Sequence, residues 1–272
     1  MNKYLRLFRL GNGIMGIIAV VIGAFLAVGT DVGNYVLNII IACFVVIAFI
    51  AGGNSLNDYI DRELDKTAHP DRPLPTGEIT PKNALICGIA GLALACVLSL
   101  FMQSLEATAI VIIAAVLMVG YEVGLKQRGF VGNLTIAVLT GMVFLFGGAV
   151  AGSAHSNIIV AVMAMLVSVG REIAKDIEDM DSDKGERKTL PMSIGAKKAS
   201  YLAAVFFIAG PILSIYPLAV SMFNIMYCLV LVADAMFIYC AWILFANAHK
   251  CEKTAKMAML VALVAFILGV IQ

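Results

Sequence analysis

Long apolar runs and short polar connections alternate along the chain. Nine runs approach the roughly 20 apolar residues that a helix needs to cross a membrane. They cover residues 12–30, 34–53, 83–103, 106–122, 131–152, 156–175, 199–217, 221–247 and 255–271. Because backbone polar groups inside a bilayer must find their partners within the protein, such runs form helices. The pattern therefore predicts an all-α, polytopic membrane protein with nine transmembrane helices.

Composition agrees with this prediction. Of the 272 residues, 61% are hydrophobic and 14% are charged, whereas charged residues make up about 25% of a soluble domain. The first run is too long for the apolar region of a signal peptide and is expected to remain as a span. Five of the six cysteines fall in apolar runs and Cys251 falls in a predicted loop. Their spacing predicts neither a metal site nor a disulfide framework, so packing is their expected role.

The basic residues indicate how the predicted helices are oriented. If nine spans alternate in direction, all 19 lysines and arginines fall on the same side of the membrane. The opposite turns contain none of them; these turns are residues 29–34, 103–106, 152–156 and 216–221. Since basic residues favour the cytoplasmic side, the N-terminus is predicted in the cytoplasm and the C-terminus outside. The expected location is the cell membrane, with polar cytoplasmic loops.

A cluster of acids and amides follows the second apolar run. Residues 54–65 contain three aspartates and two asparagines. In a helix, Asn57, Asp61 and Asp65 share one face, and Asp58 lies beside it. Like charges at this spacing repel, so a cation is needed to hold them together. Carboxylates suit Mg²⁺, which shares its remaining ligand positions with water and substrate phosphates.

A second acidic cluster follows the sixth run and matches the first. Asp176, Asp179 and Asp183 are spaced to share a helix face. At a shift of 118 residues, Asp58, Asp61 and Asp65 fall on these three aspartates, Pro73 falls on Pro191 and Gly77 falls on Gly195. The match suggests an internal duplication within a single domain of residues 1–272, with halves of about 1–125 and 126–272. Two such halves are expected to present their acidic faces to one central cavity.

Two acidic faces and nearby cations describe a site for Mg²⁺ and a pyrophosphate. Neutralising the developing charge makes pyrophosphate a better leaving group. From an allylic isoprenoid, its departure leaves a resonance-stabilised carbocation that a nucleophile can capture. Membrane helices would enclose the prenyl chain and keep water away from the cation.

These motifs resemble the UbiA-type intramembrane prenyltransferase superfamily, whose fold is also all-helical with nine spans. The resemblance covers nearly the whole chain. Its pieces are Asn57-x3-Asp61-x3-Asp65, Asp71-Arg72-Pro73-Leu-Pro75-Thr-Gly77, Tyr121-x4-Lys126, Gly132-Asn133, Asp176-x2-Asp179-x3-Asp183 and Lys188-Thr189-Leu190-Pro191.

The resemblance implies roles for individual residues. Metal binding goes to Asn57, Asp61, Asp65, Asp176, Asp179 and Asp183, and the catalytic set is Asp61, Asp65, Asp179, Asp183 and Lys126. Arg72 and Lys126 match cations that contact the pyrophosphate, and Tyr121 is placed to hydrogen-bond Lys126 or the phosphate. Arg9 and Asn12 match a looser Arg-x2-Asn element, also on the substrate side. Asp58 and Asp181 are not expected to take a direct part.

The amino-acid sequence of the motifs is most similar to that of archaeal members of the superfamily. These members attach a second geranylgeranyl chain to the free hydroxyl of geranylgeranylglyceryl phosphate. The resemblance thus implies a prenyl pyrophosphate, a lipid-like phosphate acceptor and membrane lipid as partners, with no nucleic acid. Cations for an anionic acceptor are available at Lys184, Arg187 and Lys188, or at Lys3, Arg6 and Arg9. An aromatic acid, as in quinone synthesis, is anionic too, so the charges leave both acceptors open.

A transporter is the alternative function from a different class of protein. An ion-coupled secondary transporter also uses acidic sites, but those lie near the bilayer midplane, whereas these clusters lie at the predicted cytoplasmic ends of their spans.

Asp234 lies inside the eighth run, where a charge costs a few kcal/mol. It is expected to face the protein interior, either in a structural hydrogen bond or against the acceptor.

Overall fold

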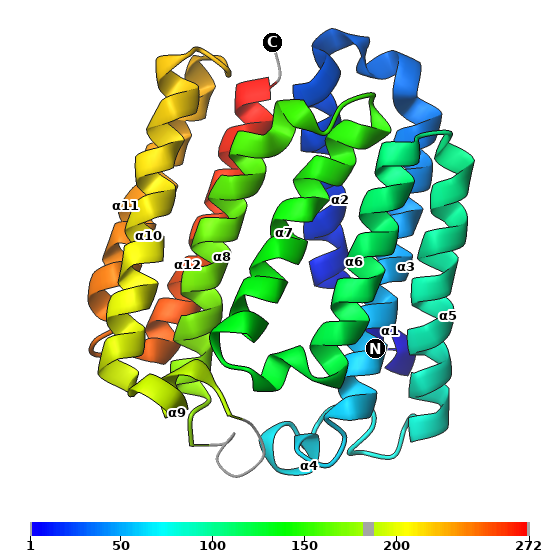
Figure 1. The fold of residues 1–272 in the computed structure, drawn as a ribbon, viewed down its shortest axis with the longest axis vertical. Coiled ribbons are helices and arrows are strands. Elements are labelled where there is room, and N and C mark those ends of the chain that lie inside the picture. Colours follow the sequence, from blue (N-terminus) through cyan, green and yellow to red (C-terminus); the bar gives the residue numbers. More distant parts are fainter. Residues whose placement is uncertain (1, 182–187, 271–272) are drawn as a thin grey trace. The chain divides into compact units, whose positions relative to one another are not determined.

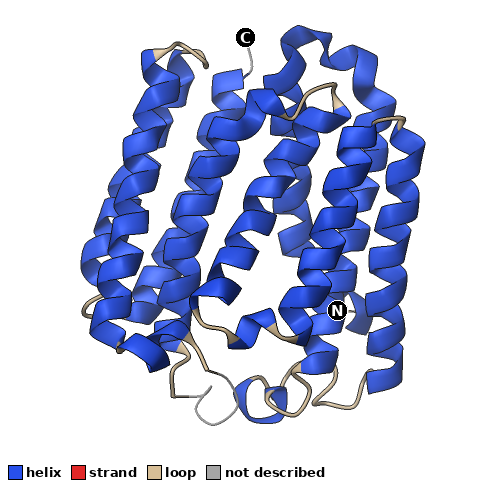
Figure 2. Ribbon diagram, in the orientation of Figure 1, coloured by secondary structure: helices blue, strands red, loops and turns tan. Residues whose placement is uncertain are grey.

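The computed structural model describes residues 2–181 and 188–270, and these residues form helices and turns with no β-strand among them (Figure 2). Eight segments are long and apolar enough to span a membrane: Gly13–Ile60, Pro81–Met102, Leu105–Val123, Phe130–Val150, His155–Glu178, Ala196–Ala219, Ile225–Ile243 and Ala248–Val270. The predicted all-α, multi-pass membrane protein is therefore confirmed. The first segment has 48 residues and contains two α-helices.

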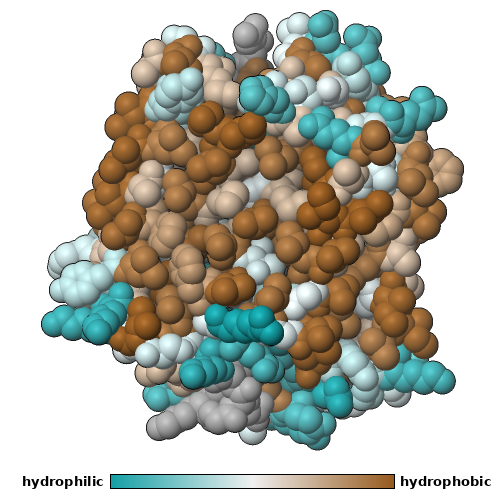
Figure 3. All heavy atoms as spheres, in the orientation of Figure 1, coloured by the Kyte–Doolittle hydropathy of each residue, from teal (hydrophilic) through white to brown (hydrophobic). Residues whose placement is uncertain are grey.

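The exposed side chains of these helices are largely apolar. Leu37, Ile89 and Val116 are 70%, 61% and 66% exposed. In Figure 3, hydrophobic side chains cover most of the helix surfaces and hydrophilic ones gather towards the helix ends. In water such a surface would be costly, but in lipid it contacts a solvent of its own polarity.

One compact unit comprises residues 1–123 and 145–156. Its elements, labelled in Figure 1, are α1 (Lys3–Phe8), α2 (Leu10–Val28), η1 (Gly29–Tyr35), α3 (Val36–Ile60), α4 (Asp65–Ala68), α5 (Pro81–Ser99), η2 (Leu100–Met102) and α6 (Leu105–Val123). The C-terminal end of α7 (Phe130–Val150) also belongs to it. Helix α3 packs most closely against α5 and α2 in this unit.

The other compact unit comprises residues 124–144 and 157–272. Besides the rest of α7, it contains η3 (Leu125–Gln127), α8 (Ile158–Glu178), α9 (Leu190–Ile194), α10 (Ala196–Ala219), η5 (Ile225–Leu229), α11 (Val230–Ile243) and α12 (Ala248–Val270). The chain passes from the first unit to the second within the short η4 (His155–Asn157), after Ser156. Buried residues such as Phe207, Phe237 and Cys240 form the core of this second unit.

Small residues let the helices approach closely, as expected for membrane helices. A Cβ atom on Gly91 of α5 would lie 2.7 Å from Gly52 Cα and 2.8 Å from Ala48 O on α3. A Cβ on Gly147 would lie 2.3 Å from Val20 O. A Cβ on Gly16 or on Gly141 would likewise lie 2.6 Å from a side-chain atom of a neighbouring helix, Val46 Cγ1 and Met165 Cγ respectively.

The prediction that Cys251 lies in a loop is wrong. It lies in the first turn of α12, fully buried. The predicted apolar run begins only at residue 255, although the helix begins at Ala248. The N-terminal part of the helix carries Lys250, Lys253 and Lys256, so the hydrophobic pattern does not reveal it. Lysine is a good helix former, and Asn247 Oδ1 accepts a 2.8 Å hydrogen bond from Lys250 N to cap the first turn.

Asp234 forms a hydrogen bond inside the second unit. Ser214 Oγ of α10 donates to Asp234 Oδ2 of α11 at 2.6 Å, and both residues are buried. The contact joins two neighbouring helices and gives a polar group in an apolar interior the partner it requires. It supports the structural reading of Asp234.

Replacing Gly91 with alanine should destabilise the first unit. The new methyl group would meet backbone atoms of α3, which cannot move aside as a flexible side chain can. Overpacking of this kind costs about 1–3 kcal/mol, so the thermal unfolding temperature in detergent should fall. Gly33→Ala is the matched control, because no atom lies within 4 Å of its added Cβ; equal stability of the two variants would contradict the packing argument.

Candidate active site

Helix α3 carries the first acidic motif at its C-terminal end. Asn57 and Asp58 lie in its last turn, Asp61 follows the helix as its C-cap, and Asp65 begins α4. The α-helix therefore does not continue to Asp65, as the shared-face prediction required. Asp61 N still bonds Asn57 O at 2.9 Å, and Asp65 N bonds Asp61 O at 2.8 Å. These two bonds keep the helical spacing of the motif while the chain begins to turn back.

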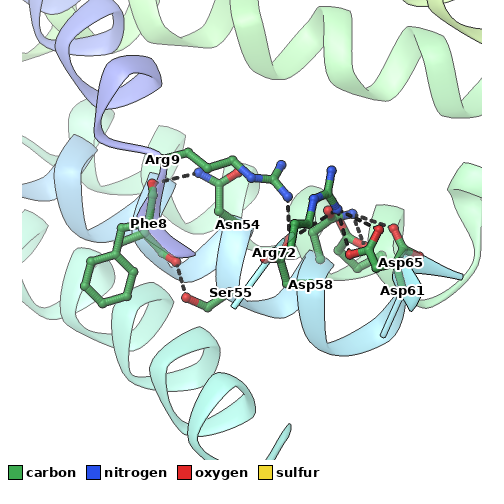
Figure 4. Close-up of polar contacts among 11 residues, drawn as sticks. Phe8, Arg9, Asn54, Ser55, Asp58, Asp61, Asp65 and Arg72 are labelled. Atoms are coloured by element: carbon green, nitrogen blue, oxygen red, sulfur yellow. Dashed lines mark hydrogen bonds and ion pairs between the residues drawn. The ribbon is translucent and has the colours of Figure 1, made fainter. Parts of the chain in front are cut away.

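Asp58 is the most buried acid of the motif, with 1% of its surface exposed. Its Oδ1 pairs with Arg9 Nη2 and lies 3.6 Å from Arg72 Nη1 (Figure 4). Arg9 and Arg72 both received substrate roles from the sequence, whereas Asp58 received none. The structure shows that the two arginines share this one buried carboxylate, so Asp58 fixes their positions.

Arg72 also binds Asp65 through both carboxylate oxygens. Its Nη1 lies 2.8 Å from Oδ1 and 2.6 Å from Oδ2 of Asp65, which is 2% exposed. The loop that presents Arg72 is closed by backbone hydrogen bonds, including Ile79 N to Pro73 O at 3.0 Å. Gly77 supplies the positive φ of 77° that this turn needs. A short, ordered loop thus holds a guanidinium group against two acids of the motif.

The break between α1 and α2 places Arg9. Arg9 has φ 49° and ψ 56°, a left-handed conformation that is costly for a residue with a Cβ. Asn54 Nδ2 of α3 donates a 2.9 Å hydrogen bond to Phe8 O, which ties this break to α3 (Figure 4). The ion pair with Asp58 then offsets part of the backbone cost, and the guanidinium is directed to the acidic motif. The side chain of Asn12 lies outside the described part of the structure.

Asn57 connects the motif to an acid that the sequence analysis missed. Asn57 Nδ2 donates to Asp61 Oδ2 at 3.0 Å and lies 3.2 and 3.3 Å from the two carboxylate oxygens of Glu122. Glu122 is in the last turn of α6 and is 3% exposed. The sequence did contain a signal for Glu122. It is an acid at the end of an apolar run, and it directly follows Tyr121 of the Tyr121-x4-Lys126 motif.

Glu63 differs from these acids although it lies in the same segment. It is exposed and pairs with Lys66 at 2.6 Å. This hydrogen bond lowers the pKa of Glu63 below its usual value. Because its side chain is exposed whereas those of the other acids are buried, it makes a suitable reference position.

The oxygen groups around Asn57 have the right chemistry for Mg²⁺. Asp61, Asp65 and Glu122 are buried carboxylates, and Mg²⁺ prefers oxygen ligands. Within the described residues, no three acids, cysteines or histidines converge as a complete metal cage. Mg²⁺ is usually held by one or two carboxylates together with substrate phosphates, and this arrangement fits that pattern.

The second acidic motif has the same local geometry in its own unit. Helix α8 ends at Glu178, and Asp179 is its C-cap with φ −85° and ψ 3°. The corresponding values at Asp61 are −85° and 8°. Asp179 N bonds Lys175 O at 2.9 Å, as Asp61 N bonds Asn57 O. Asp176 and Asp179 are half-buried, and Asp183 lies outside the described residues.

The predicted cations of the second unit fall into two groups. Lys126 in η3 is 7% exposed, whereas Lys188 is exposed. Lys188 and Arg128 line an open pocket of about 290 Å³, together with Gln127, Phe130 and Ser193. Lys184 and Arg187 lie outside the described residues. Tyr121 is half-buried on α6, in the first unit.

Comparisons with known proteins agree with these motifs. Residues 16–268 match the model of the UbiA prenyltransferase family. A digeranylgeranylglyceryl phosphate synthase of Methanosphaera stadtmanae is 37% identical over 276 residues, which cover 99% of each chain. The synthase of Thermococcus kodakarensis is 35% identical and covers 98% of each chain.

Solved structures give the same result for the fold. One, described as giving structural and mechanistic insights into digeranylgeranylglyceryl phosphate synthase in membranes, has a TM-score of 0.80 and 35% identity, covering 98% of this chain and 97% of the other. A UbiA homologue from Archaeoglobus fulgidus bound to GPP and Mg²⁺ has a TM-score of 0.69 at 15% identity, covering 99% of each chain. The second likeness shows a shared fold.

Replacing Asp58 with asparagine should destabilise the first unit and loosen Arg9, whereas Arg72 keeps its two hydrogen bonds to Asp65. The loss of hydrogen bonds to a charged group costs about 1–2 kcal/mol when the partners keep some contact with water. Thermal unfolding in detergent measures the change. Glu63→Gln removes an exposed carboxylate from the same segment and should have no measurable effect; a comparable loss in that control would argue against a special role for Asp58.

Proposed function

The chain belongs to the UbiA prenyltransferase family, and from this we propose that it is a digeranylgeranylglyceryl phosphate synthase. The reaction transfers a geranylgeranyl group from geranylgeranyl pyrophosphate to the free hydroxyl of geranylgeranylglyceryl phosphate. Its products are digeranylgeranylglyceryl phosphate and pyrophosphate, a step in making archaeal ether lipids. Full-length similarity to synthases from several archaea supports this assignment.

The observation that carries the proposal is the set of buried acids and arginines at the end of α3. Asp58 and Asp65 hold Arg72, and Asp58 also holds Arg9. Two guanidinium groups fixed by buried carboxylates are suited to bind pyrophosphate oxygens, because their positions need little reorganisation. The same cluster supplies carboxylate oxygens for Mg²⁺.

Mg²⁺, when bound, would neutralise charge on the pyrophosphate as it leaves. Its ligands come from Asn57, Asp61 and Asp65 in the first motif and from Asp176, Asp179 and Asp183 in the second. The assignment of both motifs to one pyrophosphate follows from their family resemblance. Arg72 and Lys126 stabilise the charge that develops on the leaving group, with Tyr121, Arg9 and Asn12 as further substrate contacts.

Bond changes in the proposed reaction balance without a redox partner. The allylic carbon–oxygen bond to pyrophosphate breaks, and both electrons leave with the pyrophosphate. The acceptor hydroxyl oxygen then bonds to the allylic carbon and loses its proton. The apolar spans keep water from capturing the carbocation first. Lys184, Arg187 and Lys188 are proposed to bind the phosphate of the acceptor.

The proposed topology has nine spans around a central cavity, with the N-terminus and the site on the cytoplasmic side. The segment Gly13–Ile60 has 48 residues, about 70 Å of helix, which is more than twice the membrane core. A φ of 57° at Gly29 interrupts it, so we assign two crossings to it. The one-sided distribution of basic residues supports the orientation.

Two repeated halves within one domain are also proposed. At the shift of 118 residues, α2, α3, α5 and α6 fall on α7, α8, α10 and α11 in order, and α12 has no counterpart. Gly77 and Gly195, which correspond at this shift, have φ values of 77° and 86°. Helices α3 and α8 also end at residues that correspond at this shift, Ile60 and Glu178, which further supports the duplication.

Purified protein with Mg²⁺ and geranylgeranyl pyrophosphate should release pyrophosphate only when geranylgeranylglyceryl phosphate is added. The prenylated lipid product is followed by mass spectrometry. 4-Hydroxybenzoate in place of the lipid tests the aromatic alternative, and its prenylation would replace the proposed acceptor. Inactivity with both acceptors, in protein that remains folded, would count against a prenyltransferase with either substrate.

Asp61→Ala and Asp179→Ala should each reduce turnover by at least about 100-fold, because each removes a carboxylate proposed to hold the Mg²⁺–pyrophosphate complex. Single-turnover rates at saturating substrate measure the loss. Asp31→Ala in η1, remote in sequence from both motifs, is the control and should keep its activity. A fully active Asp61→Ala or Asp179→Ala enzyme would remove that residue from the site.

A further inference from the structure

We infer that Glu122 is a positioning residue that fixes the orientation of the Asn57 side chain, and through it the proposed Mg²⁺ site. Neither the motif nor its resemblance to a family assigns a role to this acid. The inference rests on the proposed function for its consequence, but its geometry stands on contacts within the first unit. These contacts come from α3 and α6, two elements of the same unit.

Asn57 Nδ2 is placed between two acids. It donates to Asp61 Oδ2 at 3.0 Å and to the Glu122 carboxylate at 3.2 and 3.3 Å. The amide nitrogen has two hydrogens. One serves Asp61 and the other is shared by the two oxygens of Glu122.

The two acids determine which way the amide faces. An ionised carboxylate only accepts hydrogen bonds, so the oxygen of Asn57 placed on that side would repel both neighbours. The hydrogen-bond network therefore assigns Nδ2 to the side of the acids. Oδ1 lies on the opposite branch of the same planar group and is directed away from them. Asn57 can then offer an oxygen, rather than an N–H group, to a cation.

Packing between α3 and α6 makes this contact possible. One helical turn before Asn57, Gly53 lies against Met118, and a Cβ on Gly53 would be 3.1 Å from Met118 Cε. Met118 is one turn before Glu122 on α6. The absence of a side chain at Gly53 lets the two helices approach, and the next turn brings Glu122 to Asn57. A carboxylate that is 3% exposed requires such polar partners.

This orientation matters because Mg²⁺ binds oxygen and is repelled by an N–H donor. Partners that orient metal ligands typically change metal affinity by about 10-fold to 100-fold when they are removed. Glu122 should therefore affect the Mg²⁺ requirement of the enzyme more than its maximal rate. A residue that only filled space would not separate these two quantities.

Glu122→Gln is the direct test, since it keeps the size of the side chain and removes its acceptor-only character. The Gln amide can donate to Asn57 Oδ1, so only Asp61 still favours Nδ2 on this side and the orientation of the Asn57 amide is no longer fixed by two acceptors. The Mg²⁺ concentration for half-maximal transfer should rise by at least about tenfold, while the rate at saturating Mg²⁺ should remain within about threefold of wild type. Glu63→Gln, the same change at an exposed position, should alter neither value.

Metal binding is measured separately from catalysis. Mn²⁺ is titrated by electron paramagnetic resonance in the presence of the unreactive thiopyrophosphate analogue of geranylgeranyl pyrophosphate. Glu122→Gln should weaken Mn²⁺ binding by the same factor as it raises the Mg²⁺ requirement. Unchanged Mn²⁺ binding would overturn the inference even if transfer slowed. This titration also decides the role of Glu122 if the wild-type protein proves not to transfer a prenyl group.

A second substitution should restore the site. Asn57→Asp alone places a third carboxylate beside Asp61 and Glu122 and should weaken Mn²⁺ binding. Combined with Glu122→Gln it should recover most of the binding, because the Gln amide donates to one Asp oxygen and leaves the other for the metal. Failure of the double variant to exceed both single variants would contradict the inference.

Folding is checked for each variant by its elution in detergent and its unfolding temperature. If Glu122→Gln does not fold, Glu122→Asp takes its place, because it retains an acceptor-only group at this position. That variant should keep Mn²⁺ affinity within about threefold of wild type. A tenfold loss in folded Glu122→Asp would overturn the inference.

Discussion

The buried carboxylate of Asp58 is the contact on which the first acidic motif depends. It pairs with Arg9, which lies at the break between α1 and α2, and approaches Arg72 from the loop before α5. Three separate segments of chain therefore meet at one charge. Without compensation such a charge could not be buried, so the acid and the two arginines require one another. In the proposed function, this rigid group of cations binds the pyrophosphate.

Close helix packing provides the frame for these charges. Gly52 and Gly91 bring the backbones of α3 and α5 into contact, and Gly53 admits Met118 of α6. In a membrane the hydrophobic effect does not drive helices together, so contact between small residues has greater weight. The same packing that stabilises the helices sets how far the polar groups at the C-terminal ends of α3 and α6 can reach. Asn57 and Glu122 meet one turn beyond the Gly53–Met118 contact.

The two acidic motifs share more than their sequence. Both helices end at equivalent residues, both following aspartates have nearly the same φ and ψ, and both downstream glycines have positive φ. One difference is informative: Asn57 of the first motif corresponds to Lys175 of the second. The amide that holds Asp61 and Glu122 therefore belongs to the first motif alone.

The sequence by itself determined the helical membrane class, the family and the two acidic motifs, because hydrophobic runs, charge spacing and short motifs are local properties of the chain. It placed Arg72 and Arg9 on the substrate side but gave no role to Asp58 and did not mention Glu122. Only the tertiary structure decided these two, since their partners are 49 residues away for Asp58 and 65 residues away for Glu122. Long-range contacts of this kind depend on how closely helices pack, which no local pattern records.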